Sequence, residues 1–426
     1  MTDFQTTKPT KLNSTLIIGG GIVGATLALK LLQANLPVTL IDARPALTPE
    51  DWQRKFAKRD ARVYALSLAS IELLKQVGAW QLISQSARKA DYYQMQVWQQ
   101  DGMGELKFAD EHSPTLLGSM VEPLVIEHAL YQRLYQYQDS DLLTLVSGHK
   151  VTQMDWCGQK IGYQITLDNQ QCYQGKLLVG ADGRGSFVRQ QAGIDLAHLD
   201  YQQIAICCAI QTEKPHRATA RQAMLPTGTL ALLPLADITD EDKANPQHWQ
   251  SVVWTLPKNR ALELLQDGDK ERLIAQELAS ASGYELGHIQ QIESIASFPL
   301  TAQQAERYIA DNLVLIGDSA HGVHPLAGQG LNLGMLDVQA LFDGLMADYQ
   351  RSGGKIWGHR QTLQRYERER RPHNSMMMHS FSLINWLFAG DFARLRPVQQ
   401  LRSVGVHQVS QNKWLMKQLA KKASGV

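Results

Sequence analysis

Three glycines near the N-terminus have the spacing of a phosphate-binding turn. Gly19, Gly21 and Gly24 form a GxGxxG motif between a short apolar run and a segment of helical density. The first glycine permits a tight turn, the second lets the backbone approach a pyrophosphate, and the third lets the helix pack closely on the strand. Asp42 follows the next apolar run, where a carboxylate can accept hydrogen bonds from an adenosine ribose. The motif predicts a bound dinucleotide but does not separate NAD from FAD.

Two later segments also place glycine and acidic residues directly after apolar runs. Residues 180–189 (GADGRGSFVR) are equally consistent with a ligand-binding turn and with an ordinary helix start capped by Ser186. Residues 317–334 (GDSAHGVHPLAGQGLNLG) pass from Asp318 through a glycine-rich loop into a helix whose first amides can face an anionic group. An enzyme that binds only NAD would leave both segments without a role, so they argue against that class.

The elements that must position these motifs follow the order strand, glycine turn, helix, strand. Four apolar runs that end at glycine or acidic residues predict buried strands: 14–18, 37–41, 176–179 and 312–316. Three alternating runs predict antiparallel strands with one covered face: 92–98, 230–235 and 251–256. Helical patterns cover residues 22–33, 331–349 and 362–371. We therefore predict a doubly wound α/β domain, an inserted antiparallel sheet and a helical C-terminal region.

Composition narrows the class of protein. A chain of 426 residues exceeds the size at which one hydrophobic core stops growing, so two subdomains are expected. With 42 Lys and Arg against 41 Asp and Glu, there is no electrostatic reason to expect nucleic acid, and the expected ligand is a small molecule. The four cysteines have no CxxC or metal-ligand spacing, and we interpret them as core thiols of a protein in a reducing compartment.

The C-terminus adds a second expectation about location. Beyond Asp391 the chain carries seven Lys and Arg residues and no acidic residue. An amphipathic helix on an anionic membrane and a solvated basic terminus both fit this pattern. No run is long and apolar enough to span a membrane, and residues 1–12 lack the apolar core of a signal peptide. We predict a cytoplasmic protein and leave peripheral contact with the inner membrane face open.

Four motifs occur in an order that identifies a family. They are GGGIVG, residues 60–67 (DARVYALS), GADGRGSFVR and GDSAHGVHPLAGQGLNLG. In this order the chain resembles single-component aromatic-ring flavin hydroxylases of the para-hydroxybenzoate hydroxylase fold. HPLAGQGLNLG, Met120-Val121-Glu122, residues 181–189 and residues 365–371 (RYERERR) are most similar to the ubiquinone-biosynthesis hydroxylases. Residues 93–108, 213–222 and 251–256 resemble the 2-polyprenylphenol hydroxylase branch.

The resemblance implies a Rossmann-like FAD-binding domain with an inserted, mainly antiparallel substrate domain and a helical C-terminal region. Its discontinuous FAD-binding domain would comprise residues 1–90, 121–198 and 299–350. The substrate domain would comprise residues 91–120 and 199–298, and the helical region residues 351–426.

The resemblance also implies cofactor contacts at matching positions. They are Gly19, Gly21, Gly24, Asp42, Arg62, Asp182, Arg189, Gly317, Asp318, Pro325, Gly328, Gly330, Leu331 and Asn332. The glycines of the GxGxxG motif and Arg62 would hold the pyrophosphate, and Asp42 would hold the adenosine ribose. Asp318 would bind the ribityl or phosphate region, and residues 325–332 would line the isoalloxazine. The segment with Asp182 and Arg189 would serve both FAD and a pyridine nucleotide. Three positions depart from the family: Asp42 replaces Glu, Ser319 replaces Ala, and Pro123 replaces Asn.

The chemistry implied by the resemblance is hydroxylation of a hydrophobic prenylated phenol. Reduced FAD would form a C4a-hydroperoxide with molecular oxygen, and the electrons would come from NADPH, NADH or another donor. His324 is the candidate acid-base residue, whereas a structural role is favoured for His321. Asn332 is expected to contact the flavin or cap its helix. No metal is required.

Several interpretations stay open at this level. Four aromatic residues fit either a hydrophobic substrate pocket or the core of a sheet: Trp98, Trp254, Phe298 and Tyr93. Residues 365–371 fit a solvated helix with i,i+4 ion pairs better than a phosphate site. Hydroxylation of a later quinol intermediate, FAD chemistry without oxygen insertion, and a flavin-stabilised scaffold in a biosynthetic complex are the alternative functions.

Overall fold

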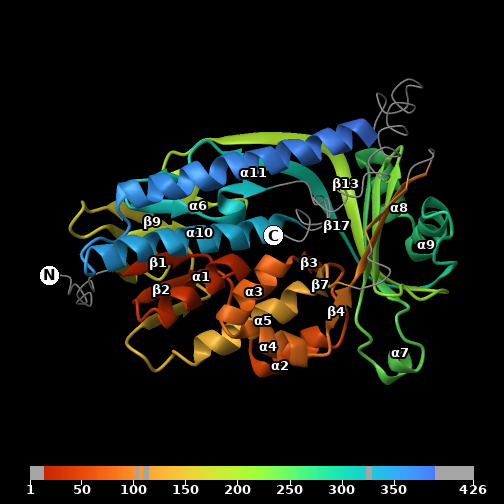
Figure 1. The fold of residues 1–426 in the computed structure, drawn as a ribbon, viewed down its shortest axis with the longest axis horizontal. Helices are drawn as coiled ribbons and strands as arrows, with labels where there is room; N and C mark the ends of the chain where they lie inside the picture. The colour runs from red at the N-terminus through yellow and green to blue at the C-terminus, as the bar shows by residue number, and fades with distance from the viewer. Residues whose placement is uncertain (1–13, 101–104, 109–114, 323–328, 389–426) are drawn as a thin grey trace.

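A computed structural model describes residues 14–100, 105–108, 115–322 and 329–388 (Figure 1). The predicted sites at His324, Pro325 and Gly328 lie outside the described residues, as does the basic segment after Asp391. The described residues form two large sheets, two small sheets, and a set of helices that join them.

A six-stranded sheet brings the predicted buried strands together. In spatial order it contains β18 (Ile309–Ala310), β19 (Leu313–Leu315), β12 (Leu177–Gly180), β1 (Thr15–Ile18), β2 (Val38–Asp42) and β8 (Leu143–Ser147). All neighbours are parallel except β18 and β19. Strands β1, β12 and β19 are buried along their whole length, as parallel strands covered on both faces require. The four predicted apolar runs are therefore confirmed as neighbours in one sheet.

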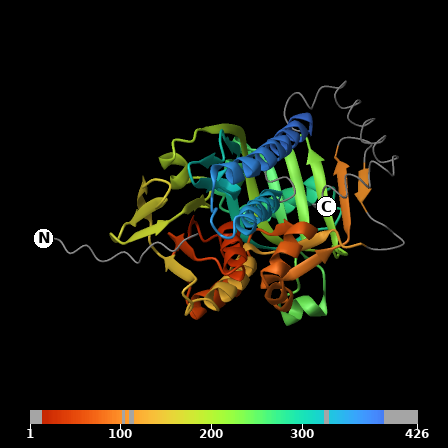
Figure 2. The ribbon, with the colours of Figure 1, turned by 60° about the vertical axis from the view of Figure 1, so that its left-hand side comes forward.

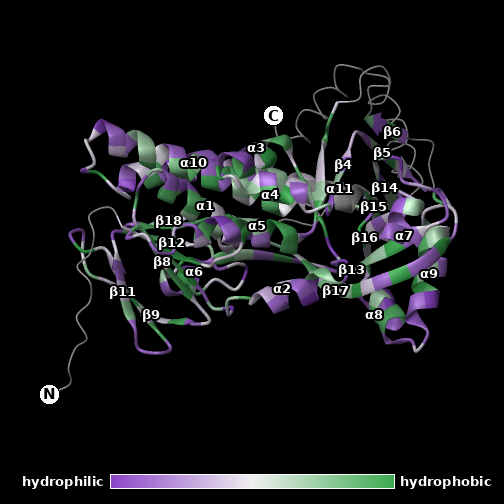
Figure 3. Ribbon diagram, turned by 90° about the horizontal axis from the view of Figure 1, so that it is seen from below, coloured by the Kyte–Doolittle hydropathy of each residue, from purple (hydrophilic) through white to green (hydrophobic). Residues whose placement is uncertain are grey.

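Helices and a small sheet cover this parallel sheet. Helix α1 (Ile22–Gln33) contacts α5 (Pro123–Tyr135) on one side and α10 (Gln329–Arg351) on the other. The small antiparallel sheet consists of β9 (Val151–Trp156), β10 (Tyr163–Leu167) and β11 (Cys172–Gly175). Strand β11 contacts β1, and β9 contacts α6 (Phe187–Gln191). In Figure 3 helix α1 is mostly hydrophobic, whereas α2 (Pro49–Phe56), which buries no residue, is mostly hydrophilic.

An eight-stranded sheet forms the second large layer. In spatial order it contains β20 (His321–Gly322), β17 (Ile289–Ala305), β13 (Leu196–Thr212), β16 (Trp249–Pro257), β15 (Gly228–Pro234), β14 (Thr219–Leu225), β5 (Gln94–Gln99) and β6 (Glu105–Phe108). All pairs are antiparallel except β14 with β5. Helices α8 (Lys258–Gln266) and α9 (Lys270–Ala281) cover its outer face, and Figure 2 shows β5 and β6 at one edge.

The predicted strand over 92–98 is in fact two strands in different sheets. Residues 89–92 form β4, which pairs with β7 (Gly118–Val121); β7 also pairs with β3 (Tyr64–Leu66) in a second small sheet. Residues 94–99 form β5 of the eight-stranded sheet. The chain changes sheets at Tyr93, whose N–H donates to the carbonyl of Ala218.

One expectation about buried side chains needs correction, and one open alternative is decided for two residues. Cys207 and Cys208 are buried, but Cys157 is exposed and Cys172 only partly covered, because both lie at strand ends of the small β9–β11 sheet. Trp254 packs in the core between the eight-stranded sheet and helices α8 and α9, whereas Phe298 packs with Ala61 on the opposite face of the sheet. These two aromatic residues therefore do not line one pocket.

The C-terminal region begins with two long helices that run side by side. Helix α10 is followed by α11 (Arg360–Phe388), and the two pack against each other (Figures 1 and 2). The expectation of a solvated helix over 365–371 is wrong for the inward face, because Tyr366 and Arg370 are buried. Within the described parts of the chain, no helix is both long enough and apolar enough to cross a membrane.

Candidate active site

The GxGxxG turn connects β1 to α1, and two of its glycines are required by the protein itself. Gly19 has a φ of +107°, and its N–H donates to the carbonyl of Ile41 over 2.7 Å. A Cβ on Gly19 would overlap the carbonyl of Ala181, and one on Gly24 would overlap the carbonyl of Gly19. A Cβ on Gly21 would meet no protein atom within 4 Å. The second glycine therefore faces free space, as a turn that admits a pyrophosphate requires.

The first turn of α1 is suited to an anion. Gly21 is the N-cap and contributes no side-chain cap, and the first turn holds no acidic residue. The first N–H groups of a helix have no partner within it, and they carry the positive end of the helix dipole. A pyrophosphate placed against Gly21 would satisfy these groups.

Asp42 ends β2 with a buried carboxylate that is held from two sides. Its Oδ2 accepts a hydrogen bond from the Gly20 N–H at 3.0 Å, and its Oδ1 accepts one from the Arg44 N–H at 2.8 Å. The Arg44 guanidinium also donates to Oδ2 at 2.9 Å and to Glu127 at 3.1 Å. Hydrogen bonding to Asp42, together with the charges of both carboxylates, raises the pKa of Arg44. The cation therefore stays charged beside the two acids.

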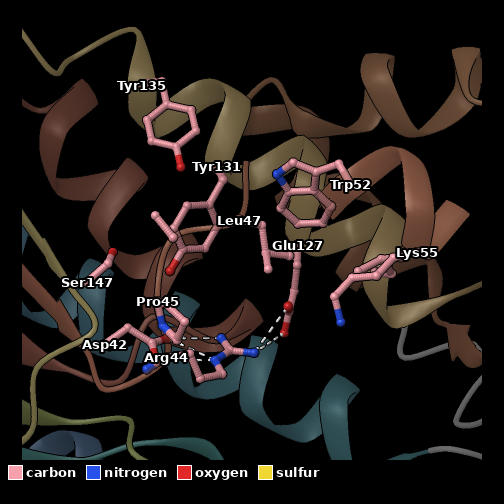
Figure 4. Close-up of a pocket in the computed structure, with 12 residues that line it drawn as sticks. Asp42, Arg44, Pro45, Leu47, Trp52, Lys55, Glu127, Tyr131, Tyr135 and Ser147 are labelled. Atoms are coloured by element: carbon pink, nitrogen blue, oxygen red, sulfur yellow. Dashed lines mark hydrogen bonds and ion pairs between the residues drawn. The ribbon is translucent and has the colours of Figure 1, made fainter. Parts of the chain in front are cut away.

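A pocket of about 270 Å³ adjoins this carboxylate (Figure 4). It is lined by Asp42, Arg44, Pro45, Ala46, Leu47, Trp52, Lys55, Leu124, Glu127, Tyr131, Tyr135 and Ser147. Tyr131 donates a hydrogen bond to the carbonyl of Gly20 over 3.1 Å, which ties the pocket wall to the glycine turn. The pocket combines aromatic walls with the Asp42 carboxylate.

The second motif caps helix α6 and is tied to the third motif. Ser186 accepts a hydrogen bond from the Arg189 N–H at 2.9 Å, so the predicted serine cap is confirmed. Asp182 accepts one from the Val188 N–H at 3.1 Å, and burial raises the pKa of its carboxyl. The buried guanidinium of Arg189 donates to the carbonyls of Ser319 at 2.8 Å and Arg184 at 2.9 Å. In this structure Arg189 therefore joins the two motifs.

The third motif turns at the end of β19. Gly317 has a φ of +59° and starts the short 3-10 helix η1 (Gly317–Ser319). The side chain of Asp318 is half exposed and lies 3.6 Å from the Arg184 guanidinium. The Ser319 hydroxyl is buried, 2.6 Å from the carbonyl of Gly180 and 2.8 Å from that of Ile316. The serine that departs from the family pattern thus binds the neighbouring strand.

His321 is buried and engaged by an acid from α10. Its Nε2 lies 2.5 Å from Asp337 Oδ2, and its ring stacks at 6.0 Å on Tyr308. Burial alone would raise the pKa of Asp337, but the charges and hydrogen bonds of His321 and Arg370 outweigh it and hold that pKa at about 2. This setting agrees with the structural role expected for His321.

Arg62 lies over a strand of the eight-stranded sheet, whereas Asn332 lies at the start of α10. The exposed Arg62 guanidinium lies 4.6 Å above the ring of Phe298. Asn332 Oδ1 accepts hydrogen bonds from the Ser67 N–H and the Ser70 hydroxyl, and its Nδ2 donates to the carbonyl of Ala65. The Asn332 side chain therefore ties α10 to the DARVYALS segment, and any flavin contact would come from its backbone.

The remaining two predicted positions, Gly330 and Leu331, lie at the start of α10. Gly330 is partly exposed in its first turn, and Leu331 belongs to the main hydrophobic core. Sequence reasoning missed Arg44, Glu127, Tyr131, Asp337 and Arg370. Arg44 had a local signal, its position two residues after Asp42, and Asp337 lies three residues beyond the third motif, on the helix that this motif enters. Glu127, Tyr131 and Arg370 come from helices that no glycine motif marks.

Known proteins match this chain over nearly its whole length. A sequence family described as FAD binding domain matches residues 13–380. The 3-demethoxyubiquinol 3-hydroxylase of Escherichia coli is 33% identical over 426 residues, covering 99% of this chain and 100% of the relative. The chain belongs to the family of FAD-dependent ubiquinone-biosynthesis hydroxylases. The ubiquinone hydroxylase UbiL of Rhodospirillum rubrum is also 33% identical, over 94% of this chain and 86% of the relative.

Solved structures agree on the fold. PqsL of Pseudomonas aeruginosa, a probable FAD-dependent monooxygenase, superposes with a TM-score of 0.71 over 93% of this chain and 99% of that one. Its sequence is only 19% identical, so the likeness concerns the fold alone. The p-nitrophenol 4-monooxygenase PnpA of Pseudomonas putida also has a TM-score of 0.71, over 96% of this chain and 97% of that one, at 15% identity.

Membership of this hydroxylase family makes the chain an FAD-dependent monooxygenase, with FAD as cofactor and a reduced nicotinamide and molecular oxygen as co-substrates. The residues fit FAD at the glycine turn, where Gly21 leaves free space in front of an uncapped helix. They also fit it at Asp42, whose carboxylate is fixed beside an aromatic pocket.

Proposed function

We propose that the chain hydroxylates the aromatic ring of a polyprenylated phenol in ubiquinone biosynthesis. The observation that carries this proposal is the meeting of three motifs at the carboxyl ends of adjacent parallel strands, in a chain that matches hydroxylases of that pathway along its length. Ligands of open α/β sheets bind outside these strand ends.

We propose the cofactor contacts residue by residue. The N–H groups at Gly21 and the first turn of α1 hold the pyrophosphate, and the Asp42 carboxylate holds the adenosine ribose inside the pocket of Figure 4. The half-exposed Asp318 carboxylate faces the ribityl region. Bound FAD supplies the activation of molecular oxygen that ring hydroxylation requires.

The eight-stranded sheet supports a site for a flat substrate ring. Strand β13 presents Ile204, Ile206 and Ile210 to helices α8 and α9. On its other face it presents Ala205, Cys207 and Ala209. This face of small side chains lies against Ala61, and Ser251 of β16 donates a hydrogen bond to the Ala61 carbonyl. We propose that the substrate ring binds beside this face, on the FAD-binding side of the sheet.

The test uses isotopically labelled molecular oxygen. Purified protein reconstituted with FAD is given NADPH or NADH and a short-chain prenylphenol, and the product is analysed by mass spectrometry. We expect one labelled oxygen atom in the ring product and none with the Gly21→Trp variant, whose side chain fills the pyrophosphate space. The proposal would be contradicted if the nicotinamide were oxidised while all of the phenol was recovered without a labelled oxygen atom.

A second candidate substrate is a later quinol intermediate. It is favoured by the Escherichia coli relative, which is named for a 3-demethoxyubiquinol. Mass analysis of the quinone intermediates in a strain lacking the gene separates the two candidates. Accumulation of a prenylphenol supports the first, and accumulation of a demethoxyquinol supports the second.

We also propose that the basic segment after Asp391 brings the enzyme to the membrane or to a biosynthetic complex. Its seven cations without an acid suit an anionic lipid surface, where prenylated substrates reside. Truncation after Asp391 should lower sedimentation with anionic vesicles but not with neutral ones. Equal sedimentation of both forms would leave a protein complex as the only role proposed for this segment.

A further inference from the structure

A buried cluster of four side chains connects the Gly317–His321 turn to the two C-terminal helices. His321 belongs to the turn, Asp337 to α10, and Arg370 and Asn374 to α11. None of the four is more than 5% exposed. Charged groups are rarely buried this deeply unless each is paired, so the cluster requires an explanation.

Asp337 lies at the centre of the cluster and divides its two oxygens between two parts of the chain. Oδ2 accepts a hydrogen bond from the Gly317 N–H at 3.0 Å and lies 2.5 Å from His321 Nε2. Oδ1 accepts hydrogen bonds from Arg370 Nε at 2.8 Å and Asn374 Nδ2 at 3.2 Å. One oxygen therefore holds the turn, and the other holds helix α11.

Helix α11 is also attached to the strands around the turn. The Tyr366 hydroxyl donates to the carbonyl of Leu315 at 2.9 Å, two residues before Gly317. Glu367 accepts a hydrogen bond from the Tyr308 N–H at 2.7 Å. Arg370 additionally donates to the carbonyl of Leu333 in α10 at 3.3 Å and to Asn374 Oδ1 at 3.0 Å. The helix thus contacts β19, the start of β18 and α10 through one face, and it reaches the turn through Asp337.

We propose that Asp337, Arg370 and Asn374 are positioning residues for the flavin. By fixing Gly317 and His321 they hold the adjoining Asp318 carboxylate in place, so that the C-terminal helix sets how tightly FAD is bound and how easily it is reduced. This inference rests on the proposed FAD contact at Asp318. It gives α11 a part in the cofactor site that the glycine motifs do not reveal.

The chemistry of the cluster predicts which substitutions disrupt it. Gly317, Arg370 and Asn374 each direct an N–H donor at Asp337, one at Oδ2 and two at Oδ1, so the carboxamide of Asp337→Asn would direct its own donor at another donor in either orientation. Arg370→Gln removes the charge that balances the carboxylate. Arg370→Lys keeps the charge but loses the forked geometry, so it should restore part of the loss. Arg368→Gln is the matched control, because Arg368 is exposed on the same helix and bonds only to the Gln364 carbonyl among the described residues.

The experiment measures FAD affinity and the flavin midpoint potential of these variants, with folding of each apoprotein checked by circular dichroism. We expect Asp337→Asn and Arg370→Gln to bind FAD at least tenfold more weakly and to shift the midpoint potential, and Arg368→Gln to stay within twofold of wild type. Folded Asp337→Asn and Arg370→Gln proteins with wild-type affinity and potential would overturn the inference.

A milder variant keeps the test decisive if the first two do not fold. Asn374→Ala keeps both buried charges and removes the bonds to Asp337 and Arg370, together with the contacts to Tyr308 and His373. We expect it to shift the potential and weaken FAD binding about threefold. Unchanged values in Asn374→Ala would overturn the inference. A wild-type protein that binds no FAD would instead overturn the proposed function, and this inference with it.

Discussion

The first and third glycine motifs occupy similar places in the fold but are held in different ways. Both follow strands of the same parallel sheet, β1 and β19, with β12 between them. The turn at Gly19 is shaped by close approach of its own backbone to the neighbouring strand ends, at Ala181 and Ile41. The turn at Gly317 is held by buried charges from two helices that follow it in the chain. The first turn therefore depends mainly on close backbone packing, with one hydrogen bond from the Gly20 N–H to the buried Asp42 carboxylate, whereas the third turn depends on buried charges.

The largest expected effect comes from removing one charge of the second arrangement. Arg370→Met leaves the buried Asp337 without its arginine partner, and breaking such a pair costs about 3–5 kcal/mol of unfolding free energy. Chemical denaturation measures this loss. Arg360→Met is the control, since Arg360 is largely exposed and lies 3.9 Å from Asp311; it should cost less than about 1 kcal/mol. Equal losses of unfolding free energy in the two variants would contradict the conclusion that buried charges hold the Gly317 turn.

The close backbone packing of the first turn is tested by substituting two glycines of the GxGxxG motif. Gly24→Ala places a methyl group against the Gly19 carbonyl and should cost roughly 1–3 kcal/mol of stability in the apoprotein. Gly21→Ala meets no protein atom, so it should change apoprotein stability by less than about 1 kcal/mol. It should nevertheless weaken FAD binding, measured by titration. A stable Gly24→Ala protein with normal FAD affinity would show that the backbone contact is not required.

Acid should loosen the third motif selectively. Because the pKa of Asp337 is about 2 in the folded protein against an ordinary 3.8, the folded state binds its proton less readily than the unfolded chain. The stabilisation is complete above pH 3.8 and is lost as the pH falls toward 2, an effect on the order of 2 kcal/mol. Unfolding curves of wild type and Asp337→Asn should converge over this interval. Parallel curves would contradict the assignment.

The smallest effect is expected at Ser319. Its hydroxyl joins the third motif to Gly180, and Ser319→Ala removes one neutral hydrogen bond worth about 0.5–1.5 kcal/mol. Since alanine is the common residue of the family here, FAD affinity should stay within twofold of wild type. A loss as large as that of Arg370→Met would mean that the turn depends on the strand contact more than on the buried charges.

Local patterns predicted most of the fold. Apolar runs that end in glycine or acid marked four strands of the parallel sheet, because buried strands need uniform hydrophobicity and their ends need special backbone. The strand over 92–98 was predicted without its break, since an alternating pattern does not show when a chain leaves one sheet for another. The aromatic residues were ambiguous for the same reason, because only strand register decides which face Trp254 and Phe298 occupy.

The sequence by itself determined the glycine turns, because each depends on residues within a short stretch of chain, and the order of the motifs along the chain determined the class of cofactor. The tertiary structure alone decided that Arg370, expected on a solvated helix, is buried against Asp337. It also decided that Arg44 pairs with both Asp42 and Glu127, a residue 83 positions away. The partner of a charged side chain can lie far away in the sequence. Which residue it is becomes fixed only when the helices pack.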